Sequence, residues 1–434
     1  MSLTKLLIAV LVLGSLTGLI LWVNKHPQDK SAATTATTKL MDVPDAQVKS
    51  VDLQKKGSPL VTLNKDKAKW TITAPAPYPA DQDAATSLVS SLSGVNADSV
   101  IEDAPTDIGK YGLTDPSLTV AVHEKNGKTE KLLFGDDVPT GSSVYAQVAG
   151  ARKVYAVSSS LKSSFNKDLN DLRDKRLLTF DSANVSRVEL TSAKSDIEFG
   201  KVNQTDWQIL KPQPFRADSF QVEDILRKLA DAKMDLTAKP DDTAFAAGKP
   251  VAIAKVTDAG GIQSLDVRQN KDDYYARSSQ VPGTFKISAD VGKLLAKPLD
   301  DFRNKKLYDF GFSDLLRLEI QQSSGDKVYT RSGTDWKLNG QTMDPGSVQT
   351  VIDKLRDLTS TAFLTAGFTT PEITITAVSN DGKRTEKVEF SKIADGYIAR
   401  RDGQSALYKL DAKSVNDILE AATAIKATAL GAKK

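Results

Sequence analysis

Few residues in this sequence have the types and spacing that catalysis or metal binding requires. The 434-residue chain has two histidines, His26 and His123, and no cysteine. A serine–histidine–aspartate relay needs a histidine that a third group holds in place, and zinc sites normally need cysteine or several histidines. We interpret His123, which lies in an expected strand, as a surface residue. The sequence therefore predicts no catalytic residue, no metal site and no cofactor-binding residue.

Acidic pairs are the remaining candidates for acid–base chemistry. Two carboxylates can hydrolyse a glycoside when they face each other across a cleft, but neighbours in sequence do not establish that geometry. We interpret the pairs as solvated loop residues: Asp136-Asp137, Asp241-Asp242, Asp272-Asp273 and Asp300-Asp301.

Two further patterns concern binding. Arg277 and Arg400 occupy equivalent places in a repeat, with Gln147 at the third place. They are candidates for a polar binding strip, although solvent-facing strand residues are the simpler interpretation. The run Gly127-Lys128-Thr129 is similar to the end of a phosphate-binding loop, but Val122 stands where that motif needs glycine. We therefore reject a phosphate site.

The elements that carry these residues occur three times. Asp81, Asp218 and Asp344 are each followed by apolar residues 4, 7, 8 and 11 positions later. This spacing is typical of a helix with one buried face, behind an aspartate suited to capping its first turn. The apolar positions are Ala85, Leu88, Val89 and Leu92; Val222, Ile225, Leu226 and Leu229; and Val348, Val351, Ile352 and Leu355.

Short strands surround each expected helix. Trp70, Trp207 and Trp336 lie in alternating apolar and polar residues before the three helices, which indicates half-buried strands. We interpret the tryptophans as core residues, with an aromatic platform for carbohydrate as the alternative. Runs of strands around one helix predict an α+β fold. We expect three tandem related domains of mainly antiparallel sheet with one principal amphipathic helix each, at residues 48–181, 182–310 and 311–434.

The charge balance argues against a nucleic-acid partner. The chain has 58 basic and 55 acidic residues, so its formal net charge is only +3, whereas nucleic-acid-binding domains usually concentrate basic residues on one face. The basic clusters Arg173–Arg176 and Arg303–Lys306 stand beside acidic residues at equivalent places. We interpret both clusters as solvated ends of helices or linkers.

The N-terminus has the composition of a membrane anchor. Residues 6–23 carry no charge and would form a helix of about 27 Å, close to the apolar thickness of a bilayer. We predict an uncleaved N-terminal transmembrane signal anchor over residues 1–30, a flexible tether over 31–47, and three domains outside the cytoplasm. Gly14 and Gly18 would allow self-association or pairing with a partner's helix, although glycine is also simply frequent in membrane helices.

A loop after the first helix carries a family resemblance. Tyr111-Gly-Leu-Thr-Asp-Pro116 follows the tryptophan strand and the Asp-capped helix, Gly367-Phe-Thr-Thr-Pro371 is similar to it, and Gly248-Lys-Pro250 is one residue shorter before the proline. With these motifs the chain resembles the bacterial domain-of-unknown-function family 4340. Such proteins are membrane-anchored and often encoded beside gliding-motility-type ABC transporter components. The resemblance supplies no catalytic residues.

The resemblance implies an extracytoplasmic accessory of a membrane complex. We expect a single-pass protein of the bacterial inner membrane, with the bulk of its chain in the periplasm. We expect it to be a scaffold or binding module, accessory to an ABC-type transporter and not an enzyme, with transporter subunits and the membrane as partners. The alternatives are a carboxylate-dependent glycan hydrolase outside the cytoplasm, or a purely structural spacer or adhesin.

Overall fold

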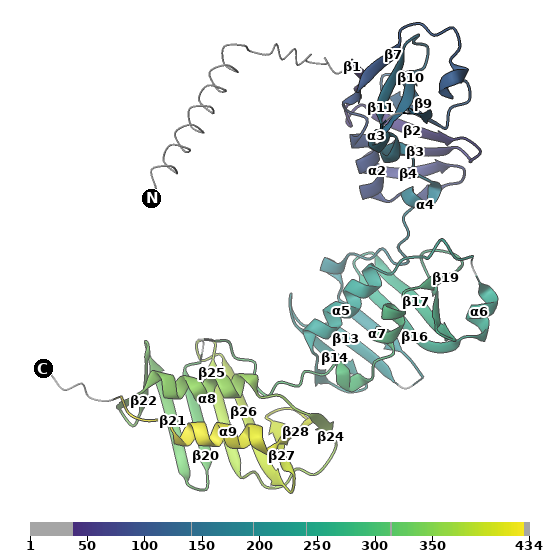
Figure 1. Cartoon of the computed structure of the whole chain (residues 1–434). Coiled ribbons are helices and arrows are strands. Elements are labelled where there is room, and N and C mark those ends of the chain that lie inside the picture. Colours follow the sequence, from purple (N-terminus) through teal and green to yellow (C-terminus); the bar gives the residue numbers. More distant parts are fainter. Residues whose placement is uncertain (1–37, 140, 194, 240, 313–314, 429–434) are drawn as a thin grey trace, which may run out of the picture. The chain divides into compact units, whose positions relative to one another are not determined.

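The computed structural model describes residues 38–139, 141–193, 195–239, 241–312 and 315–428 (Figure 1). The chain divides into two compact units, Met1–Lys175 and Arg176–Lys434. The first unit contains one copy of a sheet-and-helix repeat, called repeat 1, and the second contains repeats 2 and 3 in succession.

Repeat 1 is built on a nine-stranded antiparallel sheet with the order β5-β4-β3-β2-β8-β9-β10-β11-β7, beside a small sheet of β1 and β6. Its elements are β1 (Thr38–Met41), β2 (Val48–Lys55), β3 (Val61–Asp66), β4 (Lys69–Ala74), β5 (Tyr78–Pro79), α2 (Gln82–Ser90), β6 (Val95–Ala97), β7 (Ser99–Glu102), η1 (Gly109–Tyr111), β8 (Leu118–Glu124), β9 (Thr129–Asp137), β10 (Ser143–Val148), β11 (Val154–Ser158), α3 (Ser159–Phe165) and α4 (Leu169–Leu172).

Repeat 2 has an eight-stranded antiparallel sheet with the order β15-β14-β13-β12-β16-β17-β18-β19. Its elements are η2 (Ser182–Asn184), β12 (Arg187–Thr191), β13 (Asp196–Lys201), β14 (Trp207–Lys211), β15 (Phe215–Arg216), α5 (Ser219–Ala230), α6 (Asp242–Ala247), β16 (Lys249–Asp258), β17 (Gly261–Asn270), β18 (Asp273–Ser278), β19 (Thr284–Ile287), α7 (Ala289–Leu295) and η3 (Leu299–Asp301).

Repeat 3 returns to nine strands, in the order β23-β22-β21-β20-β25-β26-β27-β28-β24. Its elements are β20 (Arg317–Gln322), β21 (Gly325–Ser332), β22 (Asp335–Leu338), β23 (Gln341–Met343), α8 (Pro345–Asp357), β24 (Ala362–Leu364), β25 (Ile373–Ser379), β26 (Arg384–Ile393), β27 (Gly396–Arg401), β28 (Leu407–Asp411) and α9 (Ala412–Thr423).

The predicted helix starts are confirmed. Each aspartate is the N-cap, and its carboxylate accepts backbone N–H groups that the first turn would otherwise leave without a partner. Asp81 accepts from Ala84 at 3.1 Å, Asp218 from Phe220 at 3.0 Å, and Asp344 from Ser347 at 2.9 Å. The apolar residues at the predicted spacing are buried against the sheets.

The three tryptophans are core residues, as predicted. Trp70, Trp207 and Trp336 are buried, each in the hydrophobic cluster of its own repeat. The indole nitrogen of Trp207 donates to Glu223 at 2.7 Å, which satisfies its only polar atom. None of these three tryptophans has a face open to stack on a sugar.

The fold-class prediction of one principal helix per domain, preceded by a transmembrane helix, is wrong. A second helix follows the last hairpin of each repeat, namely α3, α7 and α9, and contacts strands that the first helix leaves uncovered. In repeat 3 the helices α8 and α9 have 13 and 12 residues and contact each other. A wide sheet has more apolar surface than a single helix can bury, which is why the second helix is present.

The prediction of a membrane anchor is also corrected. Residues 6–23, with Gly14 and Gly18, lie outside the described residues. Within the ranges that the structure describes, no helix is both long enough and apolar enough to cross a bilayer. This finding does not support the predicted single-pass inner-membrane protein with its bulk in the periplasm.

Linkers between repeats are folded into the sheets. We call residues 171–180 linker 1 and residues 301–310 linker 2. Asp174 N donates to Pro79 O at 2.9 Å within the first unit, and Leu177 N donates to Ala232 O at 2.9 Å within the second. Side chains at the end of each linker belong to the core of the following repeat: Leu177, Leu178 and Phe180 in repeat 2, and Leu307, Tyr308 and Phe310 in repeat 3.

The segment before repeat 1 has the same design. Lys39-Leu-Met-Asp-Val43 matches Arg176-Leu-Leu-Thr-Phe180 and Lys306-Leu-Tyr-Asp-Phe310 in residue character. A basic residue of each segment forms a backbone β-bridge with a residue 15 positions after the capping aspartate of the first helix. The bridges are Lys39 with Asn96, Arg176 with Lys233, and Lys306 with Thr359. Leu40, Met41 and Val43 are buried, so this part of the expected tether 31–47 packs on repeat 1.

Candidate functional site

His123 lies between an acid and a hydroxyl. Its Nε2 is 2.9 Å from Asp52 Oδ2, and its Nδ1 is 3.0 Å from Thr129 Oγ1. This is the order of groups in a hydrolytic relay. However, the three residues are cross-strand neighbours on β2, β8 and β9, and the cavities described below are lined by other residues. We therefore interpret the group as a surface hydrogen-bond network.

Four members of the acidic pairs have partners within the fold. Asp241 caps α6 by accepting from Ala244 N at 2.8 Å. Asp242 accepts from the Thr284 hydroxyl and from Arg277, and these donors hold the pKa of its carboxyl below the ordinary value. Asp273 pairs with Lys286 at 2.8 Å, and Asp300 with Arg303 at 3.1 Å. These carboxylates already have partners within the sheet and its loops.

Arg277 and Arg400 both stack on aromatic rings. The guanidinium carbon of Arg277 lies 4.3 Å from the centre of the Phe245 ring, and that of Arg400 lies 4.5 Å from the Phe368 ring. Phe245 lies in α6, just before the Pro250 motif, and Phe368 lies within the Pro371 motif. The equivalent residue Gln147 is buried. The two arginines therefore attach α6 and the Pro371 loop to the sheet.

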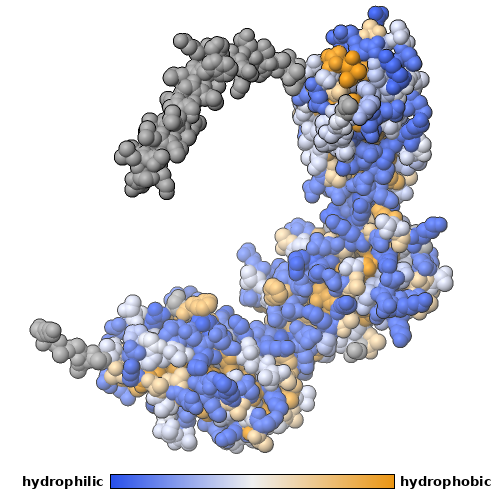
Figure 2. All heavy atoms as spheres, in the orientation of Figure 1, coloured by the Kyte–Doolittle hydropathy of each residue, from blue (hydrophilic) through white to orange (hydrophobic). Residues whose placement is uncertain are grey.

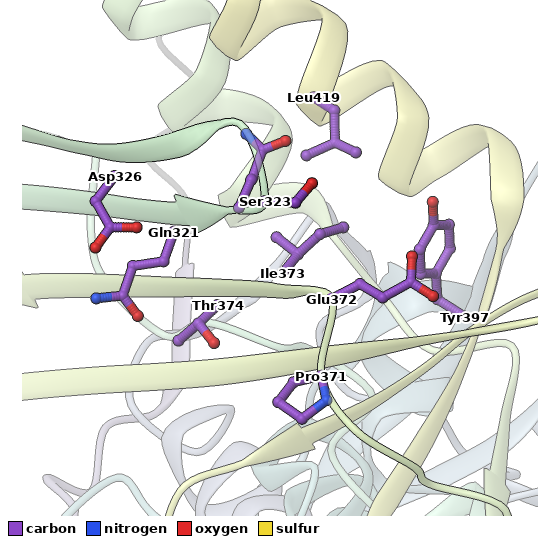
Figure 3. A pocket seen from close by; sticks show the side chains of 10 residues that line it. Gln321, Ser323, Asp326, Pro371, Glu372, Ile373, Thr374, Tyr397 and Leu419 are labelled. Carbon is purple, nitrogen blue, oxygen red and sulfur yellow. The ribbon is translucent and has the colours of Figure 1, made fainter.

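A cavity in repeat 3 is the candidate binding site. It has a volume of about 640 Å³ and lies where the β20–β21 hairpin, the start of β25, β27 and α9 meet (Figure 3). Ile373 and Leu419 supply apolar surface, and the buried Tyr397 lies beside Glu372 in the close-up. The other lining residues are Gln321, Gln322, Ser323, Asp326, Pro371 and Thr374.

The lining of this cavity favours ligands that donate hydrogen bonds or carry positive charge. Asp326 and Glu372 are its two charged residues, and both are acidic. The Tyr397 hydroxyl contacts Asn416 Oδ1 at 3.3 Å. Sequence reasoning missed this site because its residues come from five elements that are separate in the sequence. The Pro371 motif, at the start of β25, was the available signal.

Two further cavities lie in the other repeats. One of about 280 Å³ is lined by residues of the β2–β3 hairpin, including Lys55 and Pro59, and by Asp168. The second, of about 1010 Å³, lies in repeat 2 between residues 182–186 and the β13–β14 hairpin, beside Glu223. In the first of these, Lys55 pairs with Asp168 at 2.6 Å, and Lys167 is the third charged residue of the lining.

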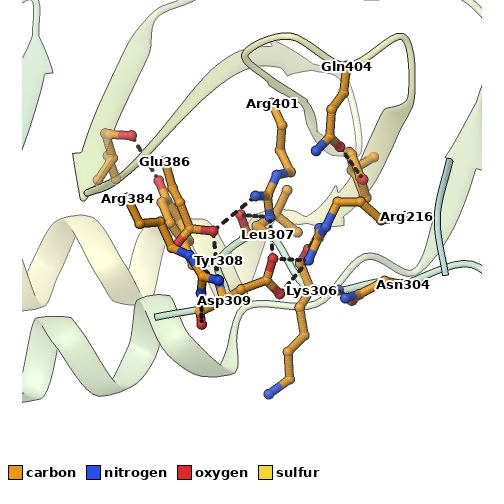
Figure 4. A network of polar contacts seen from close by, with 12 residues as sticks. Arg216, Asn304, Lys306, Leu307, Tyr308, Asp309, Arg384, Glu386, Arg401 and Gln404 are labelled. Atoms are coloured by element: carbon orange, nitrogen blue, oxygen red, sulfur yellow. Dashed lines mark hydrogen bonds and ion pairs between the residues drawn. The ribbon is translucent and has the colours of Figure 1, made fainter. Parts of the chain in front are cut away.

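A charged cluster surrounds linker 2 (Figure 4). We define it as Arg216, Asp309, Glu386 and Arg401. Arg401 donates to Glu386 at 2.9 Å and to the backbone oxygen of Leu307 at 2.8 Å. Glu386 also accepts from Asp309 N at 2.9 Å. Arg216, from the end of β15 in repeat 2, forms an ion pair with Asp309 and donates to Lys306 O at 2.6 Å.

The charged cluster holds the end of linker 2 in repeat 3. Glu386 and Arg401 are both buried, and a buried charge is tolerated only when it is paired and hydrogen-bonded. The neighbouring Tyr308 hydroxyl donates to Ile375 O at 3.0 Å, and burial raises its pKa well above the ordinary value. Linker 2 is therefore anchored through both backbone and side-chain groups.

Arg303 joins repeats 2 and 3 by aromatic stacking. Its guanidinium carbon lies 3.9 Å from the centre of the Phe215 ring in repeat 2 and 3.5 Å from that of Phe363 in repeat 3. The side chain is almost fully buried between the two rings. The basic cluster Arg303–Lys306, interpreted from sequence as a solvated end, is thus partly a packed joint.

Comparison with protein families identifies one model, described as "Domain of unknown function (DUF4340)". It matches residues 70–247 and again residues 207–376. The two matches begin at Trp70 and Trp207, which are equivalent residues of repeats 1 and 2, and together they span more than half of the chain. No curated protein matches the chain.

Among solved structures, the chain shows only a weak likeness to DNA polymerase sliding clamps from Pseudomonas aeruginosa. One with a bound ligand is 8% identical over 86% of this chain and 93% of that chain, with a TM-score of 0.16. Another is 7% identical with the same coverage and a TM-score of 0.16. Scores this low support no inference about fold or function.

Proposed function

The chain belongs to the DUF4340 family of domains of unknown function, and on this premise we propose that it is a scaffold that binds other proteins of an ABC-type transporter complex. The partner class follows from the resemblance given above, since such proteins are often encoded beside transporter components of the gliding-motility type. We propose a role in binding and assign no reaction to the chain.

The observation that carries the proposal is the way linker 2 is built. A scaffold must hold its binding surfaces at a set spacing, and a flexible linker would not do so. Linker 2 contributes side chains to the core of repeat 3, while Arg216 and Phe215 of repeat 2 contact it from the other side. Linker 2 is therefore held by side chains of both repeats.

Co-purification tests the proposal. Cells that express the tagged full chain would be crosslinked and solubilised in mild detergent, and the captured proteins identified by mass spectrometry. We expect ATPase and permease subunits of one transporter to be recovered with the chain in a fixed ratio. Recovery of the chain alone, without any crosslinked transporter subunit, would overturn the proposal.

Replacing one repeat separates a scaffold from a spacer. The control is a chain in which an unrelated domain of similar length replaces the part of repeat 1 between β2 and α4. A spacer would keep its partners, because only length matters for its function. A scaffold that uses repeat 1 for recognition would lose at least one of them.

The hydrolase hypothesis can be tested at the cavity of repeat 3, where Asp326 and Glu372 line one surface. Glycoside hydrolysis needs both an acid and a base or nucleophile. Purified full chain would be incubated with cell-surface glycans beside the Glu372→Gln variant. Release of sugar by the first and not by the second would favour an enzyme over a scaffold.

A further inference from the structure

The cavity of repeat 3 contains two carboxylates that the fold does not use. Asp326 and Glu372 are both exposed at its lining. Within the described residues, neither side chain forms an ion pair or accepts a hydrogen bond. By contrast, Glu389 on the neighbouring strand β26 pairs with Arg400 at 2.6 Å. The carboxylates of Asp326 and Glu372 are therefore available to a cation from outside the chain.

The two carboxylates stand too far apart to hold one ion. Asp326 lies opposite Gln321 on β20, and Gln321 lies opposite Thr374 on β25. Glu372 comes two residues before Thr374. With strands about 4.8 Å apart and a rise of about 3.3 Å per residue, the Cα atoms of Asp326 and Glu372 are about 12 Å apart. Figure 3 likewise shows Ile373 and Thr374 between them. An elongated ligand with a cation at each end fits this spacing.

Apolar residues line the cavity between the carboxylates. Ile373 and Tyr397 are each 5% exposed and belong to the core of repeat 3, and Leu419 of α9 packs against that core. On the face that Figure 2 shows, apolar side chains lie in small groups among hydrophilic ones, whereas the cavity brings these three together. They form a surface for the methylene groups of a ligand, because burying such groups is favourable.

Repeat 1 places a lysine of its own at the equivalent position. Ser117 corresponds to Glu372, since each stands between the proline of the shared motif and the strand that follows. Lys56 N of the β2–β3 hairpin donates to Ser117 O at 3.1 Å, and the Lys56 side chain pairs with Asp115 at 2.7 Å. In the described part of repeat 3, the β20–β21 hairpin contributes no basic residue to the cavity lining. The fold therefore accommodates an alkylammonium group at this position, and repeat 3 leaves the position to a ligand.

We propose that the cavity of repeat 3 binds an aliphatic diamine or polyamine. One terminal ammonium group pairs with Asp326 and the other with Glu372, while the chain between them crosses Ile373 and Leu419. Charge-assisted hydrogen bonds at both ends select for two positive charges, and the apolar surface selects for the methylene spacer. This inference goes beyond the proposed scaffold function and does not depend on it.

A metal ion fits the cavity less well than a polyamine. Calcium binds about six to eight oxygen atoms within about 2.6 Å, and carboxylates on residues about 12 Å apart do not converge in that way. Among the described residues, no group of three acidic, histidine or cysteine side chains could hold a metal ion. A monoamine is also a poorer fit, because it leaves one of the two carboxylates without a counter-charge.

Isothermal titration calorimetry with the purified full chain tests the proposal. Spermidine is the probe, hexylamine supplies an aliphatic chain with one charge, and hexanediol supplies one without charge. We expect spermidine to bind a single site at least about fivefold more tightly than hexylamine, and hexanediol to give no signal. Asp326→Asn and Glu372→Gln should each weaken spermidine binding about fivefold, as expected for a partly exposed ion pair.

The matched control is Asp381→Asn. Asp381 is an exposed acid in the turn after β25, so the change removes the same charge outside the cavity. Asparagine also tolerates the positive φ of 52° at this position. The affinity for spermidine should stay unchanged in this variant.

Three outcomes overturn the proposal. The first two are no binding of spermidine, and equal affinity for spermidine and hexylamine. The third is a loss in Asp381→Asn as large as in the cavity variants, which would indicate diffuse attraction to acidic residues. Hydrogen exchange of the β25 amides establishes that each variant is folded. The titration contains no transporter subunit, so the polyamine site and the transporter complex are tested separately.

Discussion

Linkers 1 and 2 are near copies that are held by different chemistry. Their sequences, Asp171-Leu-Arg-Asp-Lys-Arg-Leu-Leu-Thr-Phe180 and Asp301-Phe-Arg-Asn-Lys-Lys-Leu-Tyr-Asp-Phe310, align without a gap. In repeat 2, Thr179 N donates to the Gln263 side chain at 2.8 Å, and the Ser278 hydroxyl donates to Leu177 O. In repeat 3, Glu386 and Arg401 take the places of the glutamine and the serine.

This difference indicates that main-chain pairing determines the path of the linker, while side-chain partners determine how strongly it is attached. Main-chain pairing places both linkers in the same groove of the following repeat. The neutral side chains of Gln263 and Ser278 then satisfy backbone groups at the end of linker 1, whereas Glu386 and Arg401 satisfy those at the end of linker 2. Pro79 stands at the position of Arg216, and Thr179 at that of Asp309. Since the charges in repeat 3 are buried, its attachment depends on the complete set of partners.

Removing Arg401 is the change with the largest expected effect. Arg401→Ala leaves Glu386 buried without its counter-charge, which should destabilise repeat 3 by about 3–5 kcal/mol. The equivalent change in repeat 2, Ser278→Ala, removes one neutral hydrogen bond and should cost about 1 kcal/mol. Denaturant unfolding followed by hydrogen exchange, repeat by repeat, measures both values.

A neighbouring arginine provides the control for that experiment. Arg400 lies on the same strand but is exposed and pairs with Glu389 at 2.6 Å, so Arg400→Ala should cost about 1 kcal/mol or less. Equal losses for Arg400→Ala, Arg401→Ala and Ser278→Ala would contradict the distinction between a buried charged cluster and a neutral attachment.

The stacked arginines offer a second, smaller contrast. Arg303→Ala removes a guanidinium enclosed by two rings, with an expected cost of about 2 kcal/mol. At the equivalent place Arg173 stacks on one ring, that of Tyr78 at 4.3 Å, and the stacking part of the loss in Arg173→Ala should be about 0.5–1 kcal/mol. Amide exchange in residues 301–310 and 171–180 compares them. We expect Arg303→Ala to accelerate exchange in linker 2 more than Arg173→Ala accelerates it in linker 1. A larger acceleration in linker 1 would contradict this expectation.

A double-mutant cycle at Arg216 and Asp309 sharpens the comparison further. The variants Arg216→Ala, Asp309→Thr and the double variant remove the charges of this pair, whose equivalents Pro79 and Thr179 are uncharged. Because the two side chains form an ion pair at a partly buried joint, we expect a coupling energy of about 1 kcal/mol. The cycle is measured by the unfolding of repeat 3, and a coupling near zero would show that this pair does not stabilise the joint.

Local patterns predicted the helices and cores because their causes are local. A capping aspartate forms its hydrogen bonds within the first turn of its own helix. Each tryptophan belongs to an alternation of apolar and polar residues within a single strand. The second helices α3 and α7 were missed because they are only seven residues long and their burial depends on the width of the sheet. That width is set by strand pairings far apart in the sequence.

The candidate site was beyond sequence reasoning for a related reason. In the sequence, Glu386 and Arg401 have the pattern of ordinary strand residues. They are a buried pair because linker 2 packs against β26 and β27, where they lie. The cavity of repeat 3 likewise brings together Asp326 and Glu372 from separate hairpins. Arg303 was interpreted as solvated because its aromatic neighbours, Phe215 and Phe363, are distant in the chain.

The smallest expected effect is a pH dependence that lies in the sheet of repeat 2 and not in its linker. A hydrogen bond from Lys211, together with Arg187, holds the pKa of the buried Glu198 below its ordinary value of 4.5. A carboxyl with a lowered pKa in the folded state stabilises the fold above its unfolded pKa, and this contribution is lost as the pH falls through the folded value.

The free energy of unfolding of repeat 2 should therefore decrease below about pH 4.5, and Lys211→Met should reduce that decrease. Denaturant titrations at pH 7 and at several acidic pH values test this, with Lys233→Met, a lysine outside this ion pair, as the control. An unchanged pH dependence in Lys211→Met would show that the ion pair does not stabilise repeat 2.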